Sequence, residues 1–441
     1  MFVALGGLLL QGMLQGVIAP QRKHLLPPPF KLSGMYGKNM NRNRTMELAF
    51  GPLFLASTGF REVVASWLWI RANDMFHSGD YEGLVPLVRT VVLLDPHQID
   101  VYATGAWHMV YNFTDSDQRS DRRYIPEGVA FLKDGIANNP QPYDLYHDMG
   151  WMFFDDKIRD YPDATEYFIK ARHHGAPPFF QHEIAHSREK EAKIDECIFW
   201  WQKFRKETEA DYNKNPENPV WTERLAICNG NMSRVIIRRD GLDDLKKNPY
   251  DPKLNLDVKI TGRYKLLIQG TSRLSTGCRI YVNLQDIDYE QTLNRSFSWR
   301  INHVVVLQDS AFVEPNGSFS REIDMSKDPK FYPFAQDKYR LILSFDPRTA
   351  PSATSNPNHP PVLDFIGWSG EGLADSPWLY IDKTRPAHVN GKWYPLRMMR
   401  KEVIITKAQL QGKEPFNFRK LAGLPETPIV MPPENPPTAI K

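Results

Sequence analysis

Residues 145–178 read LYHDMGWMFFDDKIRDYPDATEYFIKARHHGAPP, and this stretch decides the fold of the first half of the chain. Two runs of apolar and aromatic residues at three- and four-residue spacing flank a short polar turn, and prolines close the segment. Such spacing is typical of amphipathic helices, because the apolar positions of a strand alternate every second residue instead. We therefore predict two helices joined by a turn.

Two earlier segments repeat this order of helix, turn, helix and proline. They are Ala65–Pro96 and Ile99–Pro140, and the second contains a charged insertion at Thr114–Arg123. A helix pair of this kind has two apolar faces and can bury both only by stacking on its neighbours. We therefore expect a helical solenoid over residues 46–246.

The packing positions of the third segment resemble those of the tetratricopeptide repeat (TPR), a helix–turn–helix unit of about 34 residues. Ala164, Phe168 and Ala171 have the spacing of that family's small, large and small packing residues, and a proline follows. The resemblance covers residues 65–178 and implies a TPR-like α-solenoid. Such solenoids present an extended concave surface for other proteins or peptides.

Two segments depart from the family pattern. Leu84 and Val91 in the first segment, and Gly128 and Gly135 in the second, stand where the family prefers alanine. We expect wider helix spacing or degenerate repeats at these positions.

The N-terminus reads as a membrane anchor. Met1–Ala19 contains no charged residue, and as a helix it would be about 28 Å long, close to the thickness of the bilayer's apolar core. A cleaved signal peptide is the alternative, but no basic residue precedes the apolar run and Pro20 follows it. We predict a single anchor at residues 1–20 and a basic linker at residues 21–45. The side of the membrane on which the body lies stays open.

Beyond Pro252 the pattern changes to short alternating runs separated by turn residues, which predicts antiparallel strands. The expected fold is therefore α followed by β, with an antiparallel β-sandwich at residues 247–410 and a proline-rich tail at residues 411–441. The expected strands are 256–260, 264–269, 279–284, 297–301, 303–307, 318–323, 339–345 and 403–406.

Composition narrows the function classes without naming an activity. The formal net charge is +3 and the mean hydropathy is −0.47, which argues against a dedicated nucleic-acid binder and a multi-spanning membrane protein. The three cysteines are Cys197, Cys228 and Cys278, an odd number at wide spacing. They encode neither a disulfide framework nor a cysteine-based zinc site.

The sharpest chemical motif is His182-Glu183-Ile184-Ala185-His186. It fits H-E-x-x-H, in which two histidines one helical turn apart bind zinc and the glutamate activates a bound water. A zinc-dependent peptidase is therefore an alternative function, with zinc as cofactor. The competing interpretation, which we prefer, is a partly packed or solvent-facing helix of the solenoid that needs no cofactor.

A catalytic zinc also needs a third protein ligand. Glu207 or Glu209 has the sequence separation of thermolysin-like enzymes, but in one straight helix Glu207 would lie about 30 Å from His186. If the chain turns back near residues 190–193, Glu196 would come closest instead.

Two further clusters have simpler interpretations. Asp286, Asp288 and Glu290 could offer oxygen ligands to calcium, although a solvated strand edge accounts for them as well. The glycines in IGWSGEGLAD, residues 366–375, lack the Lys-Ser/Thr of a phosphate loop and indicate a cluster of turns.

Tryptophans in the predicted repeats give the binding hypothesis its candidate residues. Trp67, Trp107 and Trp151 could line a groove, although at helical spacing such residues commonly form the core between repeats. We expect a membrane-anchored scaffold or adaptor for other proteins. A third hypothesis is a β domain that binds a ligand such as a glycan and is displayed on a helical stalk.

Overall fold

The computed structural model divides the chain into two compact units. The described residues are 60–79, 81–113, 124–240, 247, 249–287, 305–326, 334, 336–351, 362–427 and 429–431. Within that set, the first unit comprises 60–113, 124–158 and 170–176, and the second comprises 159–169 and 177 onward, each with the gaps above.

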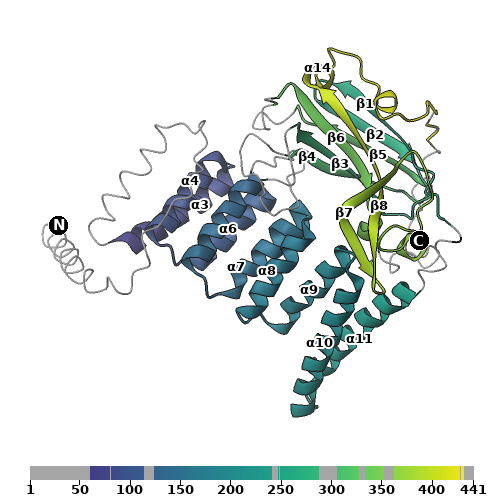
Figure 1. Ribbon diagram of the computed structural model, residues 1–441. Coiled ribbons are helices and arrows are strands. Elements are labelled where there is room, and N and C mark those ends of the chain that lie inside the picture. The colour runs from purple at the N-terminus through teal and green to yellow at the C-terminus, as the bar shows by residue number, and fades with distance from the viewer. Residues whose placement is uncertain are drawn as a thin grey trace, which may run out of the picture. The chain divides into compact units, whose positions relative to one another are not determined.

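Helices occupy the described chain from residue 61 to residue 240, and Figure 1 shows those of the first unit side by side. The helices from residue 61 to residue 240, in both units, are α3 Arg61–Ser78, α4 Tyr81–Leu94, α5 Ile99–Trp107, η1 His108–Asn112, α6 Tyr124–Asn138, α7 Tyr143–Asp148, η2 Met149–Ile158, α8 Tyr161–His173, α9 Pro178–Lys190, α10 Ile194–Lys214 and α11 Pro219–Asp240. Helix α3 packs on α4 and α5 packs on α6, as the repeated pattern predicts for the first two segments.

Local sequence explains where several helices begin and end. Gly79 ends α3 in a left-handed conformation, with φ of 76°, that glycine adopts without a steric penalty. Pro178 occupies the first position of α9, where its missing N–H costs nothing. Ala164, Phe168 and Ala171 of α8 are all buried, as their predicted packing role requires.

The glycines of α6 face aromatic rings of other helices. We expected wider helix spacing or degenerate repeats at Gly128 and Gly135, and rings from neighbouring helices occupy the space that a side chain would fill there. A Cβ on Gly128 would lie 2.7 Å from Phe153 Cζ, and one on Gly135 would lie 2.8 Å from Tyr102 Cγ. The glycines thus accept large residues at close approach.

The second half of the described chain consists of two antiparallel sheets with strand orders β1-β2-β5 and β4-β3-β6-β8-β7. The strands are β1 Asn255–Gly262, β2 Lys265–Thr271, β3 Arg279–Asp286, β4 Val305–Phe312, β5 Ser318–Asp324, β6 Lys338–Phe345, β7 Leu379–Val389 and β8 Lys392–Thr406. Inward-facing residues of both sheets, such as Val258, Ile268, Val282 and Leu341, form one hydrophobic core. An α region followed by antiparallel β structure is therefore confirmed.

Strand β7 and most of β8 were not predicted. β7 is an edge strand, and its register against β8 shifts between Asp382 and Ala387, next to Pro386. A proline and outward-facing charges are tolerated at a sheet edge, but they obscure the alternating pattern in the sequence. The expected strand at 297–301 and the acidic residues Asp288 and Glu290 lie outside the described residues.

Short helices complete the second unit. They are η3 Pro347–Thr349, α13 Val362–Ile366, α14 Lys407–Leu410 and α15 Phe418–Leu421. Assigning a tail from residue 411 was wrong for its first part, because Phe418 is fully buried in the core of the sheets and Leu424 joins it.

The predicted anchor at residues 1–20 and the linker at residues 21–45 lie outside the described residues. Among the residues that the structure does describe, no helix combines the length and apolar character needed to cross a membrane.

Candidate functional site

The H-E-x-x-H motif lies on α9, but its first histidine faces the interior of the α9–α11 helices. The His182 ring is buried, with its centroid 5.1 Å from that of Trp201 and 5.3 Å from that of Phe204. Its Nε2 atom lies 3.9 Å from the Sγ atom of buried Cys228. The neighbours of His182 are therefore those of a core residue.

His186 packs on the same indole, edge-to-face against Trp201 at 5.1 Å between centroids. Burial, together with the charges of His186 and Arg224, lowers the pKa of His182 to about 4. Burial also lowers the pKa of His186, although Glu183 and Glu189 oppose the shift. Both imidazoles are therefore neutral near pH 7. His182 is buried, whereas His186 is half-buried and lines a pocket.

The candidate third ligands lie elsewhere. The chain turns back between α9 and α10, yet Glu196 pairs with Arg188 at 3.1 Å rather than approaching His186. Glu209 pairs with Arg205 at 2.8 Å, and Glu207 is exposed on the same helix. Within the described ranges, no group of three or more His, Cys, Asp and Glu side chains is placed to hold a metal ion.

A pocket of about 330 Å³ lies beside His186 and Glu183 and contains several arginines. The Arg234 guanidinium donates two hydrogen bonds to Glu189, at 2.8 and 2.6 Å. The other two arginines are also paired, Arg238 with Asp364 at 3.1 Å and Arg348 with Asp346 at 2.5 Å. Because each arginine already has a carboxylate partner, the pocket is built from internal ion pairs.

The three candidate tryptophans lie on the surface of the first unit. Trp67, Trp107 and Trp151 are 63%, 42% and 38% exposed. Each belongs to the first helix of its pair, namely α3, α5 and the α7–η2 helix. These three indoles are therefore exposed and not buried between repeats.

Two of the tryptophans belong to one aromatic cluster with Tyr111. Ring centroids are 6.1 Å apart for Trp107 and Trp151, 4.5 Å for Trp107 and Tyr111, and 6.3 Å for Tyr111 and Trp151. We call Trp107, Tyr111 and Trp151 the aromatic cluster. His147 stacks on Trp151 with centroids 6.3 Å apart and extends it.

The aromatic cluster coincides with an unusual backbone. Trp107 ends α5, Tyr111 lies in the π-helical segment η1, and Trp151 lies in the π-helical segment η2. The Phe113 N–H donates to the carbonyl oxygen of His108, five residues back, at 2.9 Å. π-Helical turns are rare and frequently occur at functional sites, because they redirect side chains from the helical spacing.

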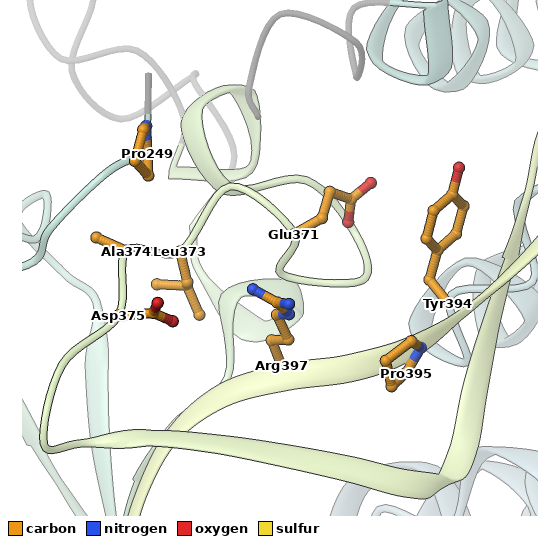
Figure 2. A pocket seen from close by; sticks show the side chains of 8 residues that line it. All are labelled: Pro249, Glu371, Leu373, Ala374, Asp375, Tyr394, Pro395 and Arg397. Carbon is orange, nitrogen blue, oxygen red and sulfur yellow. The ribbon is translucent and has the colours of Figure 1, made fainter. Parts of the chain in front are cut away.

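The glycine cluster at residues 366–375 forms turns, as predicted, and one wall of a pocket of about 430 Å³ in the second unit (Figure 2). Gly370 has φ of +75°, and a Cβ there would collide with the carbonyl oxygen of Arg397 on β8. The Arg397 N–H also donates to the Ser369 carbonyl at 2.7 Å. Figure 2 shows Glu371 and Tyr394 beside Arg397 in this pocket.

Comparisons with known proteins identify no family for the chain. No protein-family model matches it, and no curated protein matches it either. A search of solved structures finds a thermophilic TPR protein of Thermus thermophilus, at 15% identity over 42% of this chain and 98% of that chain, with a TM-score of 0.26. A TM-score this low carries no argument about fold or function, so our account rests on the contacts within this chain.

Sequence reasoning missed the residues that join the tryptophans. Tyr111, His147 and Lys157 contact the aromatic cluster or belong to it, and none was a candidate. One available signal was the repeated aromatic spacing, since Trp107 and Tyr111 are four residues apart, as are His147 and Trp151.

Proposed function

We propose that this chain is a protein-binding scaffold and that the first helices of its repeats form the binding face. One observation carries the proposal: Trp67, Trp107 and Trp151 are all exposed on the first helices of successive pairs. Exposed aromatic residues that occur in groups mark interaction sites, whereas single ones are common on any surface. Tryptophan and tyrosine are also enriched among binding hot spots.

The experiment is capture of partner proteins by the full-length chain, compared with a Trp107→Ala/Trp151→Ala variant. The control is Trp393→Ala on β8, because Trp393 is 58% exposed but lies outside the first unit. We expect partners that bind the chain and the control but are lost from the double variant. Equal recovery with all three proteins would contradict the proposed face.

We also propose that residues 1–20 anchor the scaffold in a membrane. The support is the uncharged sequence Met1–Ala19, which has the length of a spanning helix. We expect the full-length chain to stay with membranes during alkaline carbonate washing, and a chain lacking residues 1–20 to be released. Recovery of the full-length chain in the soluble fraction would contradict the anchor.

Metal analysis separates the scaffold from the zinc peptidase hypothesis. We expect purified protein to carry no stoichiometric zinc, because His182 and His186 pack on Trp201 and, among the described residues, no group of three or more His, Cys, Asp and Glu side chains could hold a metal ion. Stoichiometric zinc that disappears in His186→Ala would favour the peptidase.

A further inference from the structure

We infer that the aromatic cluster binds arginine side chains of a basic segment in the partner protein. This inference rests on the proposed function and specifies the chemistry of the partner. It follows from three features of the first unit, which are the ring geometry, an internal cation already seated on one ring, and the charge of the surrounding helices.

The ring geometry leaves aromatic surface open to a ligand. Trp107 and Trp151 lie 6.1 Å apart between centroids, with their planes inclined by 40°. Each remains more than a third exposed even though both contact Tyr111. Tryptophan is the aromatic residue that attracts cations most strongly through its ring face.

An internal cation already uses the third ring. The Lys157 Nζ atom lies 4.3 Å from the centroid of Tyr111, and Asp156 lies 3.4 Å from the same ammonium group. A ring and a carboxylate thus lie around one buried positive charge. A second cation on the two indoles would repeat that arrangement.

The charge of the surrounding helices favours a basic partner. Residues 99–112 and 143–158 together contain five aspartates and one lysine but no arginine. Asp148 lies beside the cluster, because its carboxylate is 3.8 Å from Nδ1 of His147, whose ring stacks on Trp151. Acidic groups thus flank the cluster on the His147 side as well as on the Lys157 side, which complements a basic segment.

Arginine fits this surface better than lysine for a geometric reason. The guanidinium group is planar and weakly hydrated, so it stacks on an indole while its N–H groups donate to nearby carboxylates. Lysine presents a compact, strongly hydrated charge that would exploit the ring faces less well. The expected partner segment therefore carries arginines rather than lysines.

The test uses the full-length protein and a synthetic peptide in which arginine alternates with alanine. A second peptide replaces every arginine with citrulline, which keeps the shape and removes the charge. Isothermal titration calorimetry measures both affinities for the unaltered chain, for Trp107→Leu/Trp151→Leu, for Trp151→Phe and for the control Trp393→Leu.

We expect the citrulline peptide to bind the unaltered chain about tenfold more weakly than the arginine peptide, and the double variant to lose affinity for arginine by about the same factor. Trp151→Phe should fall between, because phenylalanine keeps a weaker ring. Trp393→Leu should match the unaltered chain. Circular dichroism of each variant serves to check that its helices remain folded.

Equal binding of the two peptides, or a double variant that binds arginine normally, would overturn the inference. The proposed function fails separately. If partner capture depends on Trp107 and Trp151 while the arginine peptide does not bind, the proposed binding face is supported and the inference of a basic partner is wrong. If neither the partners nor the peptide depend on these tryptophans, both proposals fail.

Discussion

The helices of the first unit and helices α9–α11 of the second share the same paired arrangement but use their aromatic residues differently. In the first unit, Gly128 and Gly135 accept buried rings, and Trp107 and Trp151 are exposed. In α9–α11, Trp201 is fully buried and receives both histidines of the motif.

Helices α9 and α10 also make polar contacts with the β structure of the same unit. The turn of the β7–β8 hairpin, Asn390-Gly391, donates two backbone N–H groups to the carboxylate of Asp195 at the start of α10, at 3.0 and 2.7 Å. The His388 N–H donates to the Ala192 carbonyl, and Arg348 donates to the Lys190 carbonyl, both at 2.8 Å. The turn between α9 and α10 is thereby tied to the β structure. The two helical regions thus differ in whether their tryptophans are exposed or buried.

The largest expected effect contrasts one tryptophan from each region. Trp201→Ala should lower the free energy of unfolding by about 3–5 kcal/mol, because it opens a cavity lined by His182, His186 and Phe204. Trp67→Ala, at an exposed position of α3, should change it by less than about 0.5 kcal/mol. Urea unfolding measures the free energy of unfolding of both variants. Similar decreases in the two variants would contradict the expected difference between Trp201 and Trp67.

The buried histidine should make the second unit sensitive to acid. Because the pKa of His182 is about 4 in the folded chain and 6.5 ordinarily, the unfolded chain binds the proton more readily between these values. Stability should therefore fall as pH drops from 6.5 to 4, by up to about 3 kcal/mol. His182→Gln should flatten this dependence when unfolding is measured at several pH values. An unchanged slope would mean that His182 does not titrate as its burial implies.

The glycines of α6 give a smaller effect with a matched control. Gly135→Ala should destabilise the chain by about 1–3 kcal/mol, because the new methyl group meets the Tyr102 ring near its attachment to the backbone. Gly230→Ala in α11 has no atom within 4 Å of the new Cβ and should stabilise by up to about 1 kcal/mol through helix propensity. If both changes stabilise, the close approach at Gly135 is wrong.

The smallest expected effect concerns the hairpin contact. Asp195→Ala removes the acceptor of two backbone N–H groups and should cost about 1–2 kcal/mol. Hydrogen exchange at Asn390 and Gly391 should accelerate in this variant. Asp211→Ala provides the control, because its ion pair with Lys214 lies within one exposed helix turn. Unchanged exchange at both amides in Asp195→Ala would show that the contact does not hold the turn.

Local patterns in the sequence predicted much of the fold. Helical spacing, the prolines and glycines at helix ends, and the change to alternation after Pro252 all act over a few residues. They predicted the helical region and strands such as β1–β3, β5 and β6, whereas they left the turn between α9 and α10 as one of two alternatives. The buried positions of Ala164, Phe168 and Ala171 followed from the same spacing.

The features that were missed depend on contacts distant in sequence. Gly128 accepts Phe153 because another helix brings that ring to it, and no local rule shows this. His182 and His186 satisfy a zinc motif in sequence, yet Trp201 determines their surroundings. Strand β7 depends on pairing with β8, and the π-helical segments that place Tyr111 and Trp151 leave no clear periodicity.

Site-specific photo-crosslinking tests the binding face most directly. A photoreactive amino acid replaces Trp107 or Trp151 in the full-length chain in its native cells, and Phe199, an exposed residue of α10, serves as the control position. We predict crosslinks to a partner protein from both positions in the first unit and none from position 199. Equal crosslinking at all three positions, or none at 107 and 151, would contradict the account.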